Sequence, residues 1–269
     1  MVTTLRIEDF LQLAAGSFKT RARFAIALLP LLFSCAPPRP EIPMVEVPAV
    51  PLMQELERRR GSFSGLKAAA RVQTERKGRK RVHESVAFLQ QGLAKFRIEG
   101  YGPLGEPVFE ALWDGKDLML RTPGEADFVR TGAWAFERLI GFPLAPSELA
   151  AVLSGNAPPS RKGEEAQARC SEDGRCVVEF RTDDARWRVR VVPADPFRIE
   201  SADRYRGDDL VYTARFGAQE MIGGYLFPKR VTVESADRKA ALTIEYQDVE
   251  VNVPVEDSAF LLNDAGAAR

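Results

Sequence analysis

The feature of this chain that most constrains its fold is a hydrophobic period of two, which starts near Gly65 and covers most of the residues that follow. Apolar side chains alternate with mostly polar ones in short stretches, and turn-forming Gly, Pro and Asp residues separate the stretches. This pattern is typical of short antiparallel strands that bury one face, as in a β-sandwich or β-barrel. The expected strands cover residues 66–74, 82–90, 93–100, 108–113, 118–121, 176–181, 187–192, 197–202, 210–216, 225–234 and 240–251.

Three segments have helical spacing instead. Residues 52–60 predict a short helix before the first strand. In the middle of the chain, residues 133–140 and 146–154 each place three apolar side chains on one helix face, and the second segment starts with Pro146 and is followed by Gly155. Because amphipathic helices need an apolar surface to cover, the simplest arrangement is a curved sheet with helices over its concave face. The predicted fold class is therefore mainly β (α+β).

Composition and single residues argue against several classes of function. The chain has 38 basic and 38 acidic residues, whereas a nucleic-acid-binding domain is usually strongly basic. His83 is the only histidine, so a histidine-based zinc site lacks ligands, and we expect His83 on the surface. The Gly-x-Gly-x-x-Gly match at 100–105 precedes a strand-like segment, not the helix that a dinucleotide site requires. We therefore expect no enzyme activity, catalytic residue, metal or cofactor.

Two cysteines, Cys170 and Cys176, flank a short turn-like segment. A three-residue loop over 172–174 would place them directly opposite each other, with Gly174 at the left-handed position that such a loop requires. Opposed residues of two strands are close enough for a disulfide bond, which an oxidising compartment permits. The sequence therefore predicts a disulfide bond. A metal-binding or redox pair, the alternative, would normally show Cys-x-x-Cys spacing.

The N-terminal segment has the order of a secretory signal. Basic residues between positions 19 and 23 precede the apolar run 24–34, which is too short to span a bilayer. The run leads to Cys35, and residues 32–35 resemble the lipobox of bacterial lipoproteins. This resemblance implies cleavage before Cys35 and attachment of acyl chains such as palmitate there, and two or three chains anchor a protein firmly. An ordinary cleaved signal is the alternative.

Three parts follow from this interpretation. Residues 1–34 form the lipoprotein signal peptide. Residues 35–51 contain the lipidated cysteine and six prolines, and a proline-rich stretch is extended and semi-rigid, so we expect a tether. Residues 52–265 form a single domain. Ala36, and not Asp, follows the cysteine. Since Asp there retains enterobacterial lipoproteins in the inner membrane, the resemblance favours the outer membrane.

Residues 75–81 form a turn that carries five basic side chains. One interpretation is a solvated hairpin tip. The other is contact with anionic headgroups or an acidic partner, because each Lys or Arg near an anionic lipid surface contributes ~1 kcal/mol. Both interpretations remain open.

Several short motifs follow one another between residues 96 and 159: FRIE at 96–99, GPLG at 102–105, FEAL at 109–112, GFPLAPSEL at 141–149 and LSG at 153–155. In their order and spacing they resemble the lipoprotein-localisation (LolA/LolB-like) family, and within it the LolB-type outer-membrane lipoprotein receptors. After residue 159 the resemblance fades.

The resemblance implies a half-open, curved antiparallel β-barrel with a helical lid around an apolar cavity for lipoprotein acyl chains. It also implies a protruding loop whose exposed leucine inserts into the outer membrane. Leu104, between Pro103 and Gly105, matches that position, and a leucine buried in the loop is the alternative. From alternation, the expected acyl-chain pocket residues are Phe96, Ile98 and Trp113 from the sheet, and Phe136, Leu139 and Ile140 from the helices.

Together these features predict a lipoprotein anchored at the periplasmic face of the outer membrane. It would act as a chaperone in protein transport, taking lipoprotein acyl chains from a periplasmic LolA-like carrier and delivering them to the outer membrane, with no nucleic-acid partner. Transfer by graded burial of apolar chain makes or breaks no bond. Two alternatives on the same fold are a regulatory sensor of mislocalised lipoprotein and a ligand-free accessory of an envelope machine.

Overall fold

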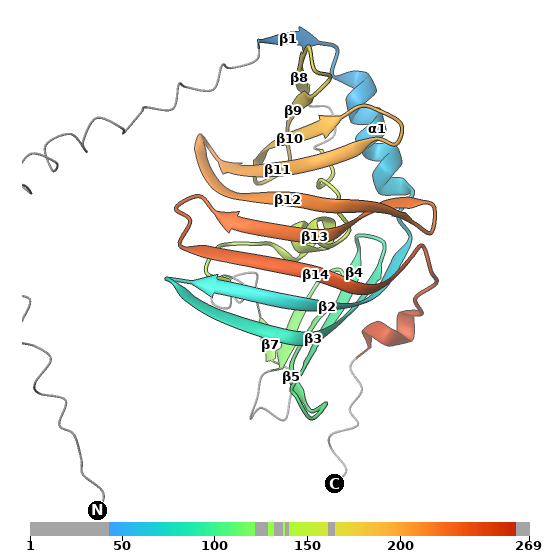
Figure 1. Cartoon of the computed structure of the whole chain (residues 1–269), viewed down its shortest axis with the longest axis vertical. Coiled ribbons are helices and arrows are strands. Elements are labelled where there is room, and N and C mark those ends of the chain that lie inside the picture. The colour runs from blue at the N-terminus through green and yellow to red at the C-terminus, as the bar shows by residue number, and fades with distance from the viewer. Residues whose placement is uncertain (1–42, 122–128, 132–136, 138–139, 161–164, 262–269) are drawn as a thin grey trace, which may run out of the picture. The chain divides into compact units, whose positions relative to one another are not determined.

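The computed structural model describes residues 43–121, 129–131, 137, 140–160 and 165–261. Every strand in this part of the chain belongs to one antiparallel sheet, with the order β1-β8-β9-β10-β11-β12-β13-β14-β2-β3-β4-β5-β6-β7 (Figure 1). The sheet curves, so that β4–β7 lie behind β2 and β3 in this view, and it does not close. The strands are β1 (Met44–Val47), β2 (Gly65–Arg76), β3 (Arg79–Gln91), β4 (Lys95–Tyr101), β5 (Pro107–Trp113), β6 (Leu118–Arg121), β7 (Val129–Thr131), β8 (Gln167–Ser171), β9 (Cys176–Arg181), β10 (Arg186–Val192), β11 (Arg198–Arg206), β12 (Asp209–Ile222), β13 (Tyr225–Ser235) and β14 (Ala240–Val251).

The strands predicted from alternation are all present, and the curved, mainly β fold is confirmed. The largest difference in length is at β12, which continues to Ile222. The structure adds β1, β7 and β8, which the alternation did not single out. β1 and β7 are short edge strands of the sheet, and so few residues carry little periodic signal.

Alternation also explains where the core lies. On β13, for example, Val231 and Val233 are fully buried, whereas their neighbours in sequence are partly exposed. Most buried apolar side chains join one continuous cluster. A second, smaller cluster is formed by Leu112, Met119 and the C-terminal residues Val255 and Phe260, the last of which belongs to the 3₁₀ helix η3 (Asp257–Phe260).

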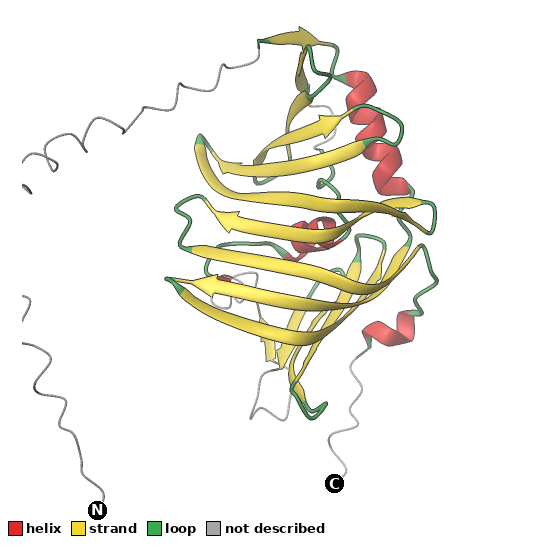
Figure 2. Ribbon diagram, viewed as in Figure 1, coloured by secondary structure: helices red, strands yellow, loops and turns green. Residues whose placement is uncertain are grey.

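The helix α3 (Pro146–Leu153) lies behind the sheet in the view of Figure 2, and each of its residues from Glu148 to Leu153 is buried. It occupies the predicted segment. Gly155 follows with a φ of +68°, and a Cβ atom there would lie 2.7 Å from the ring of Pro228, so only glycine fits. Carbonyl oxygens at positions 150, 153 and 154 accept hydrogen bonds of 2.7, 2.9 and 3.0 Å from Gln90, Tyr246 and Tyr225.

The N-terminal boundary of the folded unit differs from the expected one. Residues 35–51 were predicted to be an extended tether, with the domain starting at 52. Instead, Met44–Val47 form β1, which pairs with β8, and the helix α1 (Val50–Gly61) starts two residues before position 52. The proline rule explains the helix start, because Pro51 lies in its first turn, where its missing N–H has no partner to lose. The folded unit therefore includes part of the proline-rich stretch.

Of the helix predicted over 133–140, residues 133–136, 138 and 139 lie outside the described residues, and so do the signal peptide and Cys35. Ile140 is buried. Among the helices that the structure describes, none has the length and apolar character needed to cross a bilayer.

Candidate functional site

A cavity of about 960 Å³ lies between α3 and the strands β2–β6 and β14. This volume is at the upper end of the ~300–1,000 Å³ typical of small-molecule sites. Most of the wall is apolar, which suits a ligand with hydrocarbon chains. The apolar lining residues are Val72, Val86, Phe88, Ile98, Val108, Phe109, Ala111, Leu120, Ile140, Leu144, Leu149, Leu153, Leu242 and Ile244.

The cavity differs in part from the predicted pocket. Ile98 and Ile140 line it. Phe96 and Trp113 do not: they are buried in the core, with ring centroids 5.6 Å apart. Alternation identifies the face of a strand but not the position along it, and both residues lie at the ends of β4 and β5 that are away from the loop at 102–106. Phe136 and Leu139 are outside the described residues.

Several lining residues were not singled out from the sequence. They come from β2, β3 and β14, and they include Val86, Phe88 and Ile244. Their inward-facing positions in the alternating stretches were a usable signal, but a pocket wall and a filled core have the same pattern. The helix residues Leu149 and Leu153 carry the same ambiguity, because the apolar face of α3 forms part of the wall.

A buried polar cluster holds α3 in place. The Glu148 carboxylate lies 2.5 Å from Arg204 Nε, and it accepts a hydrogen bond of 3.0 Å from the Tyr212 hydroxyl. It also accepts a hydrogen bond from the backbone N–H of Ala145, just before the helix starts. Burial opposes the charge of Arg204, but Glu148 outweighs it and raises the pKa of Arg204. Burial, with the nearby carboxylate, raises the pKa of Tyr212.

The cavity reaches the surface at the tip of the β2–β3 hairpin. Arg76, Lys77, Arg79 and Arg81 line it there, and all four are exposed. We call these four residues the mouth. Lys77 and Gly78 have φ values of +49° and +75°, as a two-residue type I′ hairpin turn requires. The predicted basic turn therefore lies at the entrance to the cavity.

His83 lies just inside the mouth. Its side chain is half-buried, lines the cavity and packs edge-on against Phe109, with ring centroids 5.3 Å apart. The surface position expected for this histidine is therefore wrong in part. The reason is that β3 continues past Tyr101, the last residue of β4. There the ring of Phe109 from β5 packs against His83 on the inner face of β3.

The loop between β4 and β5 carries Leu104, which is 93% exposed. Figure 1 shows this green loop projecting at the lower end of the sheet. The loop is held by hydrogen bonds of its own: the N–H of Gly102 donates to Glu106 O at 2.8 Å, and the N–H of Leu104 donates to the Glu106 carboxylate at 3.0 Å. Gly105 adopts a φ of +82°. A leucine buried in the loop is thus inconsistent with the structure.

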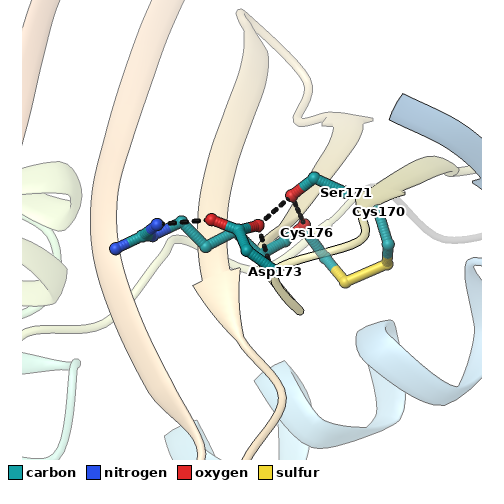
Figure 3. Close-up of a disulfide and its surroundings, with 5 residues drawn as sticks. Cys170, Ser171, Asp173 and Cys176 are labelled. Carbon is teal, nitrogen blue, oxygen red and sulfur yellow. Dashed lines mark hydrogen bonds and ion pairs between the residues drawn. A yellow bond between two sulfur atoms is a disulfide. The ribbon is translucent and has the colours of Figure 1, made fainter. Parts of the chain in front are cut away.

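The described part of the sheet also contains a disulfide bond between Cys170 and Cys176, which are paired residues of β8 and β9 (Figure 3). The loop between Ser171 and Arg175 has three residues, with Gly174 at a φ of +79°. The Asp173 carboxylate accepts hydrogen bonds from the Ser171 hydroxyl and from Arg175. Neither cysteine is among the residues that line the cavity.

Solved structures share this architecture. A LolA superfamily protein from Nitrosomonas europaea aligns with a TM-score of 0.59 and 18% identity, over 80% of this chain and 98% of that protein. The fold is LolA-like. A DUF1329 family protein from Desulfovibrio piger gives 0.58 and 18%, over 80% and 98%. A domain described as an outer membrane lipoprotein-sorting protein, from Vibrio parahaemolyticus, gives 0.59 and 12%, over 78% and 95%.

No model of a protein family and no curated protein matches the sequence. The identities to the solved structures are low, so they establish the LolA-like fold and not a shared ligand. The described residues contain no group of His, Cys, Asp or Glu side chains that could hold a metal ion. The class of ligand must therefore be inferred from the residues that line the cavity.

Proposed function

We propose that this chain is an outer-membrane-anchored lipoprotein that binds acyl chains in its cavity and delivers lipoproteins to the outer membrane. The observation that supports this function best is the cavity of about 960 Å³ with aliphatic and aromatic walls. Burial of hydrocarbon contributes about 0.8 kcal/mol per CH₂. A cargo held in this way can be passed on without any covalent chemistry, so the proposed activity is transport and not catalysis.

The contacts that hold α3 against the sheet favour a preformed site. The helix α3 is tied to the sheet by Glu148, Arg204 and Tyr212, and three of its last carbonyls are satisfied by side chains from the strands. A wall that is already fixed loses little conformational entropy when a chain enters. The lipoprotein-sorting domain among the structural neighbours is consistent with this interpretation.

Delivery would use the exposed tip at Leu104. The leucine makes no contribution to the core at 93% exposure, yet its loop is held by internal hydrogen bonds. An apolar side chain on such a tip can enter the interface of a bilayer at a favourable free energy. The cargo would come from a LolA-like periplasmic carrier.

Anchoring would use Cys35 in the mature N-terminus. The described residues start at 43, and β1 starts at Met44, so the acylated cysteine would lie nine residues before the sheet in sequence. Replacing Cys35 with Ala removes the thioether acceptor, and the protein should then no longer fractionate with the outer membrane. Normal fractionation of Cys35→Ala would contradict the anchor.

The cavity is tested by filling it. Val86 is buried and lines the cavity, whereas Val82 is four residues earlier on the same strand and is 40% exposed. In native protein extracted from membranes, mass spectrometry should find acyl-bearing molecules, and Val86→Trp should lower their amount while Val82→Trp should not. A Val86→Trp protein that folds normally and retains its ligand would refute the cavity as the binding site.

A carrier and a sensor predict different results when this protein is depleted from cells. If the protein is a carrier, its depletion should cause lipoproteins to accumulate in the periplasm. A sensor would alter a signalling output and leave their sorting intact, and a ligand-free accessory would carry no lipid at all.

A further inference from the structure

The charges of the β2–β3 hairpin are sorted by face. Arg76 pairs with Arg79 across the hairpin, and Thr74 pairs with Arg81, and all four residues line the cavity. Lys80, which lies between the two arginines of β3, does not line it, and its ammonium is 3.6 Å from the Glu75 carboxylate. Side chains alternate along a strand, and the register of β2 with β3 shifts between the pairs Val72–His83 and Ala70–Val86, so the two arginines share the inner face with Val86 and Phe88 of the apolar wall.

The outward-facing cations of this hairpin have partners. Lys80 lies beside Glu75, and Arg71 lies 3.0 Å from Glu84. For Lys77, Arg79 and Arg81, by contrast, no carboxylate of the described residues lies within ion-pair distance. Three cations at the entrance of an apolar cavity therefore have no anion to balance them in this part of the chain.

The inner face of the sheet changes from charged to apolar between the tip of the β2–β3 hairpin and the interior of the cavity. The exposed arginines come first, His83 and Thr74 follow, and then Val72, Val86 and Phe88. Burial lowers the pKa of His83, and the positive charge of Arg81 lowers it further, so the charge of Arg81 acts on a side chain that lines the cavity. Glu110 and Arg121 also line the cavity, and the Glu110 carboxylate forms ion pairs with Arg97 and Arg121. Apart from this paired group, the surface is cationic at one end and mostly hydrocarbon at the other, as an acyl-bearing anion would require.

We propose that this cavity also takes an anionic amphiphile, whose acyl chains fill the apolar part while a phosphate or similar anionic headgroup is held by Arg79 and Arg81 at the mouth. This inference rests on the proposed acyl-chain binding and adds a second ligand class to it, because the acylated cysteine of a lipoprotein carries no phosphate. Arginine suits the role, because its planar guanidinium donates two parallel hydrogen bonds to phosphate oxygens.

The position of the Leu104 loop is consistent with a ligand that enters the cavity at the mouth. In the antiparallel pairing of β3 with β4, Ser85 lies opposite Tyr101, so the loop at 102–106 and the hairpin tip are at the same end of their strands. A tip that enters the bilayer interface would bring the mouth close to lipid headgroups. Charge at the mouth and the apolar tip would then act on one ligand leaving or entering a membrane.

The test uses the full chain with Cys35→Ala and two single-chain lipids of equal chain length, at concentrations below micelle formation. Lysophosphatidylglycerol is anionic, and a monoacylglycerol, which lacks the phosphate, is neutral. We expect calorimetry to show about tenfold tighter binding of the anionic lipid, the size of one charge-assisted hydrogen bond. The double variant Arg79→Gln/Arg81→Gln should lose this preference and still bind the neutral lipid. The matched outer-face variant Arg71→Gln/Lys80→Gln should keep it.

The outcomes separate the two proposals. Equal affinity of the wild-type chain for both lipids would overturn the anionic-headgroup inference and leave acyl-chain binding intact. Failure to bind either lipid would overturn acyl-chain binding itself. If the outer-face variant loses the preference as fully as the inner-face variant, the cause is general surface charge, and the mouth site is refuted. Inorganic phosphate that binds as tightly as the anionic lipid would refute it as well, because the chains would then contribute nothing.

Discussion

The two halves of the sheet have the same alternating pattern but enclose different interiors. In the half formed by β9–β12, the inner face is filled by large aromatic side chains: Trp187 and Tyr212 are buried, with ring centroids 6.0 Å apart. In the half formed by β2–β6 and β14, aliphatic side chains surround the cavity. No residue of β8–β13 lines that cavity, although those strands are fully described.

The difference shows that one sheet can combine a closely packed half with a half that surrounds a cavity. The packed half also carries the disulfide bond, and it supplies Arg204 and Tyr212, which hold α3. The helix in turn presents Leu149 and Leu153 to the cavity. We therefore expect the packed half to supply most of the stability, so that the other half can leave space unfilled.

Glu148 connects the two halves, so its loss should have the largest effect. Glu148→Ala leaves Arg204 buried without its main partner and should destabilise the fold by about 3–5 kcal/mol. The matched control is Asp184→Ala, which removes the exposed second carboxylate of Arg204 and should cost only ~0–1 kcal/mol. Urea unfolding of the two variants would measure this. Equal costs would contradict the assigned role of Glu148.

Trp187 and Leu242 compare the two interiors directly. Trp187→Ala removes a fully buried ring from the packed half and should cost about 3–5 kcal/mol. Leu242→Ala should cost about 2 kcal/mol, the lower end for leucine, because one side of Leu242 already faces the cavity and has fewer atoms to lose. If Leu242→Ala were the more destabilising variant in urea unfolding, the cavity half would be packed as tightly as its counterpart.

The disulfide bond should contribute less. Loss of the bond in Cys170→Ala/Cys176→Ala should lower the free energy of unfolding by roughly 2 kcal/mol, as expected for a short loop. Binding of an acyl ligand should be unchanged, since neither cysteine lines the cavity. Wild-type protein under reducing conditions provides the control. A marked loss of ligand affinity in either sample would show that the two halves are coupled.

Leu104→Glu should change stability by no more than ~0.5 kcal/mol, because the side chain is 93% exposed. If Leu104 enters the bilayer, the variant should still bind lipoprotein but fail to release it into liposomes, because a carboxylate resists entry. Met221→Glu is the matched control, since Met221 is also exposed, at 54%, near the β12–β13 turn. Normal release by Leu104→Glu would reject the insertion role.

The sequence predicted the sheet well because alternation is a local signal that each strand repeats. The exposed tip at Leu104 could be expected from the flanking Pro103 and Gly105 together with the family resemblance. The cavity could not be placed in the same way. Phe96 and Ile98 have the same alternation and face the same side, yet only Ile98 reaches the cavity, because long-range packing decides where the interior stays unfilled.

The polar features depended on tertiary structure as well. Glu148 looked like an ordinary residue of the first helical turn, and its partners Arg204 and Tyr212 come from strands more than fifty residues away. The basic turn at 75–81 was visible in the sequence, but only the register of β2 and β3 separates the cations at the mouth from the outward Lys80.

His83 should show the smallest effect, and it reports on the mouth. Burial, together with Arg81, lowers its pKa below the ordinary value of about 6.5. Between the lowered pKa and 6.5 the unfolded chain binds more protons than the folded one, so stability rises with pH over this window and is lost as the pH falls through it. Arg81→Gln should raise the pKa of His83, whereas the outward-facing Lys80→Gln should not. An NMR titration can follow His83 without assignment ambiguity, since it is the only histidine. A pKa that does not respond to Arg81→Gln would show that the guanidinium does not face the cavity wall, and the distinction between a cationic entrance and an apolar interior would then lose its structural basis.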